Sequence, residues 1–247
     1  MTLILTEITE FGIAMAADSA VTTSYNLGRH SGHRVLTGVR KLQPVHYLNA
    51  GISCWGVGEI GGLDTDIWLE NFIKANQHIH KLNDFAMLLQ NELRRVLGMI
   101  EQNTAGFHLA GFVEKEGRKM PTFYHVHNGP SQYPSIAAQI DSALFNANQD
   151  MPPEDCPPGH FKITRNGDFQ LYAELFGAVE SFFNTRVRPL GIEIPSPLTL
   201  GSIAEYLRFQ IKTVSEIYKL SNLVPSIGGP VTTLTISDQG IMSYETK

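Results

Sequence analysis

The chain has 247 residues, of which 43% are hydrophobic and 17% charged, a composition that excludes an intrinsically disordered protein. The formal net charge of −5 offers no attraction for a polyanion, so nucleic acid is not an expected partner. No apolar run approaches the about 20 residues that span a membrane, and no signal peptide or CxxC pair is visible. We therefore expect a single cytoplasmic domain over residues 1–247.

The first quarter of the chain is predicted to be mainly β-sheet. Two β-rich runs, "TLILTEIT" and "GIAMAADS", meet at Glu10-Phe11-Gly12, where the glycine can adopt the positive φ of a tight turn. After a polar stretch come "RVLTGVRKLQPV" and "YLNAGISCWGVG", which read as strands with a turn at Asn49-Ala50-Gly51.

Two helices follow, because the apolar period changes from two to between three and four. Ile67, Trp68, Phe72 and Ile73 share one helical face. Asn83 or Asp84 is the expected N-cap of a longer helix. The apolar face of that helix contains Phe85, Leu88, Leu89, Leu93, Val96, Leu97 and Ile100.

Strand signals return at "GFHLAGFV" and "PTFYHVHN", which the charged turn "EKEGRKM" joins. The proline pairs at 152–153 and 157–158 predict an extended surface insertion near residues 131–160. The segment "FKITRNGDFQLY" then predicts a hairpin around Asn166-Gly167, and "AELFGAVESFFNTRV" predicts a helix.

The chain closes with an amphipathic helix and two strands, "VTTLTIS" and "IMSYE", which turn at Asp238-Gln239-Gly240. The order of strands, two helices, strands, two helices and strands indicates an α+β fold. It suits two antiparallel sheets packed face to face with a pair of helices on each outer side, a four-layer αββα sandwich. The apolar face of the last helix contains Ile203, Leu207, Ile211, Val214 and Ile217.

The motif "GIAMAADSAVTT" resembles the second strand of proteasome β-type subunits, which are N-terminal nucleophile (Ntn) hydrolases. In that family the nucleophile is a threonine sixteen residues before the aspartate, and Thr2 lies sixteen residues before Asp18. The run "VRKLQPVHYLNAGISCWGVG" matches the family's lysine and strand-end glycine with Lys41 and Gly56. Near the C-terminus, "SIGGPVTTLTIS" resembles the family's Ser-Gly-Gly turn.

The resemblance implies a catalytic set of Thr2, Asp18 and Lys41, with the backbone N–H of Gly56 in the oxyanion hole. Thr2 would act after removal of Met1, and its own α-amino group would serve as the base. Ser226 is a candidate auxiliary residue. The position three residues before the glycine turn, where the family has an aspartate, holds Leu223 or Val224.

The resemblance implies a threonine-type peptidase that hydrolyses amide bonds, with peptides as the substrate class. Two alternatives stay open: a catalytically inactive structural or assembly subunit, and a small-molecule amidase on the same fold. A homo-oligomer is expected through the helices at 64–76 and 83–102, and the family leaves room for an ATPase or regulatory partner.

No cofactor or metal is expected. His125 with His127, and His78 with His80, are each two residues apart, as on one face of a strand. Each pair lacks a Cys, Asp or Glu at the spacing of a metal site, so surface or hydrogen-bonded histidines are the simpler interpretation.

Overall fold

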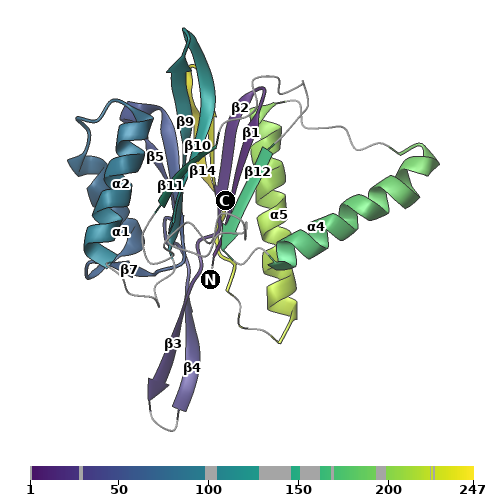
Figure 1. Cartoon of the computed structure of the whole chain (residues 1–247). Helices are drawn as coiled ribbons and strands as arrows, with labels where there is room; N and C mark the ends of the chain where they lie inside the picture. The colour runs from purple at the N-terminus through teal and green to yellow at the C-terminus, as the bar shows by residue number, and fades with distance from the viewer. Residues whose placement is uncertain are drawn as a thin grey trace, which may run out of the picture.

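The protein is described by a computed structural model over residues 2–27, 30–97, 105–127, 146–150, 162–167, 170–192, 199–222, 224 and 226–247. Met1, Cys156, Leu223 and most of the predicted insertion near 131–160 lie outside these residues. The fold is mixed α+β, with two five-stranded antiparallel sheets that pack against each other (Figure 1). No helix within the described ranges is both long and apolar enough to cross a membrane.

The first sheet contains the N-terminal and C-terminal strands. The β1–β2 hairpin turns at Glu10-Phe11, and Gly12 has a φ of 131°, as the sequence predicts. Side chains of β1 alternate between the interior, where Ile4 lies, and the helices, against which Leu3 packs. Its order is β12 (Lys162–Gly167), β1 (Leu3–Thr9), β2 (Gly12–Ala17), β13 (Thr232–Ser237) and β14 (Gly240–Thr246).

The second sheet contains the middle of the chain, in the order β11 (Asn146–Asp150), β10 (Arg118–His127), β9 (Gly106–Lys115), β6 (Ala50–Trp55) and β5 (Leu42–Val45). Two small hairpins are attached to this framework. The one formed by β3 (Val21–Leu27) and β4 (His30–Leu36) projects from the body (Figure 1). The other joins β7 (Glu59–Ile60) to β8 (Leu63–Asp64).

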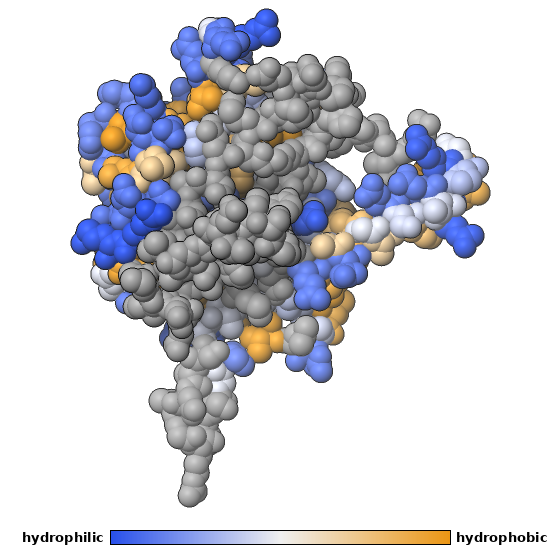
Figure 2. All heavy atoms as spheres, in the orientation of Figure 1, coloured by the Kyte–Doolittle hydropathy of each residue, from blue (hydrophilic) through white to orange (hydrophobic). Residues whose placement is uncertain are grey.

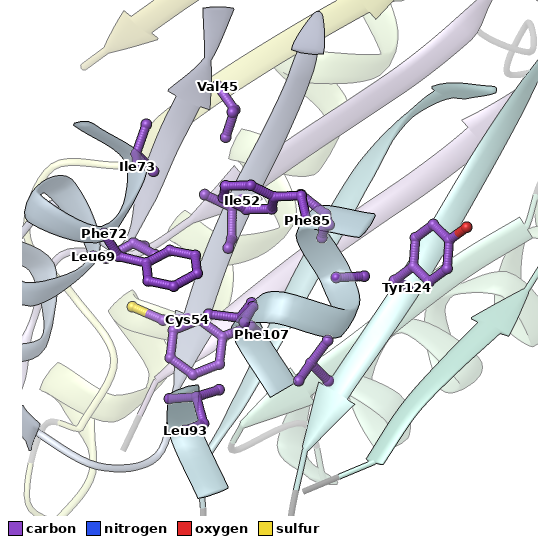
Figure 3. Packing of buried hydrophobic residues seen from close by; sticks show 14 of the residues in the cluster. Val45, Ile52, Cys54, Leu69, Phe72, Ile73, Phe85, Leu93, Phe107 and Tyr124 are labelled. Atoms are coloured by element: carbon purple, nitrogen blue, oxygen red, sulfur yellow. The ribbon is translucent and has the colours of Figure 1, made fainter. Parts of the chain in front are cut away.

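Two helices, α1 (Thr65–Ala75) and α2 (Leu82–Leu97), cover the outer face of the second sheet. Figure 3 shows the aromatic side chains that fill the space between them and the sheet. Phe72 and Phe85 pack in a T-shaped, edge-to-face contact, with ring centroids 5.3 Å apart. A short 3-10 turn, η1 (His46–Leu48), connects β5 to β6.

On the outer face of the first sheet, α5 (Leu200–Leu220) packs along its length through the predicted apolar face, with Ile217 half-buried. The other helix, α4 (Gln170–Phe182), contacts this layer only through its first turns and then projects away (Figure 1). It continues through a π-helical turn, η2 (Phe183–Val187), and a 3-10 turn, η3 (Arg188–Leu190).

The structure corrects the predicted turns around residues 49 and 166. The turn between β5 and β6 is centred on Asn49, which has a left-handed φ of 47°, while Ala50 already belongs to β6. The expected hairpin around Asn166-Gly167 does not form. Residues 162–167 form β12, which pairs with β1, and residues 170–172 begin α4. β12 pairs with the edge of β1 instead, and the local sequence around residue 166 does not indicate this pairing.

Three further expectations change. Helix α2 begins at Leu82, so Asn83 and Asp84 lie in its first turn, and the first helical hydrogen bond joins Phe85 N to the Lys81 carbonyl. Ile67, expected on the buried face of α1, is 40% exposed, because Leu69 occupies that face instead. Within the predicted insertion, residues 146–150 form β11 against β10.

Candidate active site

The Asp18 carboxylate lies just past the end of β2 and is almost completely buried. Its Oδ1 accepts hydrogen bonds from the Leu3 backbone N–H and from Lys41 Nζ, each over 3.0 Å. Its Oδ2 accepts from the backbone N–H groups of Ala20 and Gly228, each over 3.1 Å. One carboxylate therefore joins the start of β1, the segments after β2 and before β5, and the loop before β13.

Lys41 directly precedes β5 and is only 3% exposed. Besides Asp18, its Nζ donates to the backbone carbonyl of Ala20. Its own carbonyl accepts from Cys54 N at 2.9 Å, which fixes the lysine backbone to β6. A buried ammonium group is stable only when it is paired and hydrogen-bonded, and both conditions are met here.

Thr2 is 6% exposed and stands immediately before β1. Because Leu3 N and Lys41 Nζ share the same Asp18 oxygen, the two nitrogens lie within about 6 Å of each other. Gly167 of β12 lies against Thr2, so closely that a Cβ there would overlap the Thr2 carbonyl oxygen. The predicted contact of Lys41 with Asp18 is thus present. Thr2 lies next to it in the chain, because the N–H that Leu3 donates to Asp18 belongs to the Thr2–Leu3 peptide bond. A direct contact between Lys41 and the Thr2 side chain stays a prediction.

Gly56 follows the last residue of β6 and is exposed, with a φ of 94° that favours glycine. It sits two residues after Cys54, the residue bonded to the Lys41 carbonyl. The strand end that carries Gly56 is therefore tied to the strand that follows Lys41. Its N–H remains the candidate oxyanion donor.

The loop before β13 is fastened to the site through Gly228. The Gly228 N–H donates to Asp18 Oδ2, and its carbonyl accepts from Ser19 N at 3.0 Å. Ser226, the candidate auxiliary residue, is completely buried in this loop, and Val224 is half-buried. Position 224 therefore gives the loop no acidic group.

Four backbone groups that contact the Asp18 and Lys41 side chains were not identified from the sequence: the N–H groups of Leu3, Ala20 and Gly228 and the carbonyl of Ala20. Backbone donors and acceptors carry no side-chain signature. The only available signal was the Gly228-Gly229 pair, since a side chain at Gly229 would overlap the Ser19 hydroxyl.

A second polar cluster lies deeper between the sheets, centred on His108 of β9. Its ring nitrogens are within 3.0 Å of Thr6 Oγ1 and 2.6 Å of Asn166 Oδ1. Burial lowers the pKa of His108 to about 4, so the ring is neutral. His125 and His127 stack beside it, with ring centroids 4.1 Å apart.

The other histidine pair of the sequence, His78 and His80, is exposed after α1 and does not lie on a strand. The strand interpretation of this pair was therefore wrong. The segment serves as the connection between α1 and α2.

Comparison with solved structures identifies the fold. The chain superimposes over its full length on 86% of a chain of Anbu from Hyphomicrobium sp. strain MC1, a structure titled as its Gly-1 mutant, with a TM-score of 0.54 and 14% identity. Anbu is a proteasome-like Ntn hydrolase, so this chain has the fold that the sequence motifs predict. No protein-family model and no curated protein sequence matches the chain.

Proposed function

We propose that this protein is an N-terminal threonine hydrolase that cleaves amide bonds through Thr2 after Met1 has been removed. The observation that carries the proposal is the buried pair of Lys41 and Asp18, bonded through the same carboxylate oxygen to the amide next to Thr2. The four-layer αββα arrangement of Ntn hydrolases is the scaffold on which this chemistry would operate. Peptides are the proposed substrate class.

The Thr2 hydroxyl is a weak nucleophile and needs a base within reach. A free α-amino group has a pKa of about 7.7–8.0, so roughly a tenth to a sixth of it is unprotonated at pH 7 and can accept the hydroxyl proton. The reaction would form an ester between Thr2 Oγ1 and the acyl group and release the amine product. Water would then hydrolyse the ester and regenerate the free threonine.

Lys41 would support this step electrostatically. Its positive charge disfavours protonation of a nearby amine and stabilises negative charge that develops on the substrate. Asp18 would hold the ammonium group in place through a 3.0 Å hydrogen bond. The Gly56 N–H would bind the oxyanion, because glycine allows a close approach of the backbone to a ligand.

The loop before β13 supports a second candidate function, an inactive structural or assembly subunit. Where the resembled family has an aspartate, this loop has Val224 or its neighbour Leu223. In a chain that kept Met1, the Thr2 nitrogen would be part of a peptide bond and could not act as the base, which fits this second role. A small-molecule amidase would share the Thr2 chemistry and differ only in substrate.

The deciding experiment is an intact-mass measurement on protein purified from its native cell, combined with labelling by a peptide epoxyketone. The hydrolase proposal requires loss of one methionine and addition of one label. Thr2→Ala should abolish labelling and turnover, Thr2→Ser should keep part of both, and Thr213→Ala on α5 should behave as wild type. Complete retention of Met1 without labelling would refute the proposal in favour of the structural role.

A further inference from the structure

The proposed catalytic groups come from both sheets. Thr2 immediately precedes β1 of the first sheet, whereas Lys41 precedes β5 and Gly56 follows β6, both strands of the second sheet. A shift of about 1 Å in a reacting group can lower a rate about a hundredfold. The proposed chemistry therefore depends on how the two sheets are placed relative to each other.

Apolar side chains fill part of the space between the sheets. Ile4 and Met15 of the first sheet belong to one buried cluster with Leu42 and Ala110 of the second. Apolar contacts are favourable but not directional, so they tolerate small sliding movements. A hydrogen-bonded group between the sheets, in contrast, favours one distance and one angle.

His108 of β9 is such a group and is completely buried. Its Nε2 lies 2.6 Å from Oδ1 of Asn166 on β12, and its Nδ1 lies 3.0 Å from Oγ1 of Thr6 on β1. An amide oxygen can only accept, so Nε2 carries the proton, and Nδ1 of the neutral ring accepts from the Thr6 hydroxyl. His108 therefore joins the second sheet to two strands of the first.

Strand β12 lies at the edge of the first sheet, next to β1. On its outer side, the Arg165 guanidinium lies 5.5 Å from the centre of the Tyr172 ring, at the start of α4. The rest of α4 stands clear of the body (Figures 1 and 2). The bond from His108 to Asn166 holds β12 on the opposite, inner side and ties it to the second sheet.

The position of β12 is passed on to Thr2 through Gly167, the residue after Asn166. The Gly167 backbone lies so close to Thr2 that a Cβ would overlap the Thr2 carbonyl oxygen. The Thr2–Leu3 peptide unit is therefore held at both ends, because Asp18 accepts from its N–H and Gly167 packs against its carbonyl. A movement of β12 would release the carbonyl end.

We propose that His108 and Asn166 are positioning residues that place Thr2 against Lys41, with His108 acting through Asn166 and Gly167. The catalytic consequence rests on the proposed function, whereas the placement of Thr2 does not. Without the bond to His108, β12 can move relative to the second sheet, and the Thr2 carbonyl moves with it.

The first test compares Asn166→Leu with Thr6→Val on a peptide substrate. Each variant leaves one nitrogen of the buried His108 ring without its partner, so the melting temperature should fall by a comparable amount in both. Asn166→Leu breaks the connection to Gly167, and its kcat should fall about 10- to 100-fold at unchanged KM. Thr6→Val leaves that connection intact and should keep the wild-type kcat.

Two variants of His108 test the same connection from the second sheet. His108→Leu removes both hydrogen bonds and should lower kcat as Asn166→Leu does. His108→Gln places an amide N–H where it can donate to Asn166, so it should restore most of the turnover. A merely structural role would predict the same kcat for these two variants at a temperature where both are folded.

A second measurement needs no turnover and uses Thr2→Cys in a chain that also carries Cys156→Ser. A thiol beside a lysine has a pKa below its usual value of about 8.5, so the thiolate absorbance reports how close side chain 2 lies to Lys41. Cys54 stays protonated in this range, because burial raises its pKa to about 12. Adding Asn166→Leu should return the pKa of the new thiol toward about 8.5, and adding Thr6→Val should leave it unchanged.

The two measurements separate this proposal from the proposed function. A wild type without turnover would refute the hydrolase, and the thiol pKa would then decide the positioning alone. The positioning is wrong if Asn166→Leu changes neither kcat nor the thiol pKa, or if Thr6→Val has the same effects. It is also wrong if the thiol has its usual pKa before Asn166 is replaced, since side chain 2 would then not lie against Lys41.

Discussion

Gly167 of β12 lies directly against the carbonyl of Thr2, in a space that no side chain could share. This contact positions the first described residue of the chain from a strand 165 residues away in sequence. The position of Thr2 is therefore determined by the packing of β12 on β1, in addition to the hydrogen bonds of Asp18.

Gly167→Ala should reduce both stability and turnover. The φ of 93° strains any alanine, and its Cβ would push the Thr2 carbonyl away, at an additional cost of about 1–3 kcal/mol. A displacement of the nucleophile by about 1 Å can lower the rate about a hundredfold.

Gly117→Ala is the matched control for Gly167→Ala. It has a similar φ of 74°, but a Cβ there would meet no described atom within 4 Å. Equal losses of melting temperature and kcat in the two variants would show that backbone strain alone matters and that the Thr2 contact does not.

Lys41→Met should remove nearly all turnover, because the lost charge acts on the amine and on the transition state. Since the pair is buried, the variant should also lose about 3 kcal/mol of unfolding free energy. Lys74→Met, which breaks an exposed ion pair with Glu70, should change stability by less than about 1 kcal/mol and leave kcat unchanged. Full turnover of Lys41→Met on a peptide substrate would refute the role of Lys41.

Asp18→Asn should be more destabilising than Lys41→Met, at about 3–5 kcal/mol in urea unfolding. The carboxylate accepts four hydrogen bonds, whereas an amide must direct its NH₂ group at two of these donors. It also leaves the Lys41 ammonium buried without a counter-charge. If both variants unfold at the same urea concentration, the backbone bonds to Asp18 contribute little.

Glu7 should make the protein less stable as the pH rises. Burial on the helix-facing side of β1 raises the pKa of its carboxyl from 4.5 to about 7. The unfolded chain releases this proton first, so the unfolding free energy should fall by about 3 kcal/mol between pH 4.5 and 7. Glu7→Gln should abolish this component, and Glu174→Gln, on the exposed side of α4, should not.

His108 should make the protein less stable as the pH falls, the opposite of the effect of Glu7. Its pKa falls from 6.5 to about 4 because burial disfavours the charged ring, so the unfolded chain takes up the proton first as the pH drops. Stability is then complete above pH 6.5 and decreases by about 3 kcal/mol toward pH 4. His108→Gln should flatten this part of the profile. An unchanged acid limb would show that the ring is protonated in the folded protein.

The local sequence was sufficient for much of this protein. Periodicity predicted the β1–β2 hairpin, the buried faces of α2 and α5, and the order of strands and helices, because each depends on residues close together in the chain. The family motif that Thr2, Asp18 and Lys41 match also predicted the ion pair of Lys41 with Asp18, because the resemblance implies the spatial arrangement of these residues as well as their spacing.

Only the tertiary structure decided the features that depend on distant partners. Asn166-Gly167 has the sequence of a hairpin turn, yet β12 pairs with β1 because that edge was open and a local return strand was not formed. The Gly228 N–H reaches Asp18 across 210 residues, and α4 packs beside α5 only through its first turns. Composition and spacing determine which segments can form a strand or helix, whereas the choice of partner depends on which hydrogen-bonding edges and apolar faces remain uncovered when the chain packs.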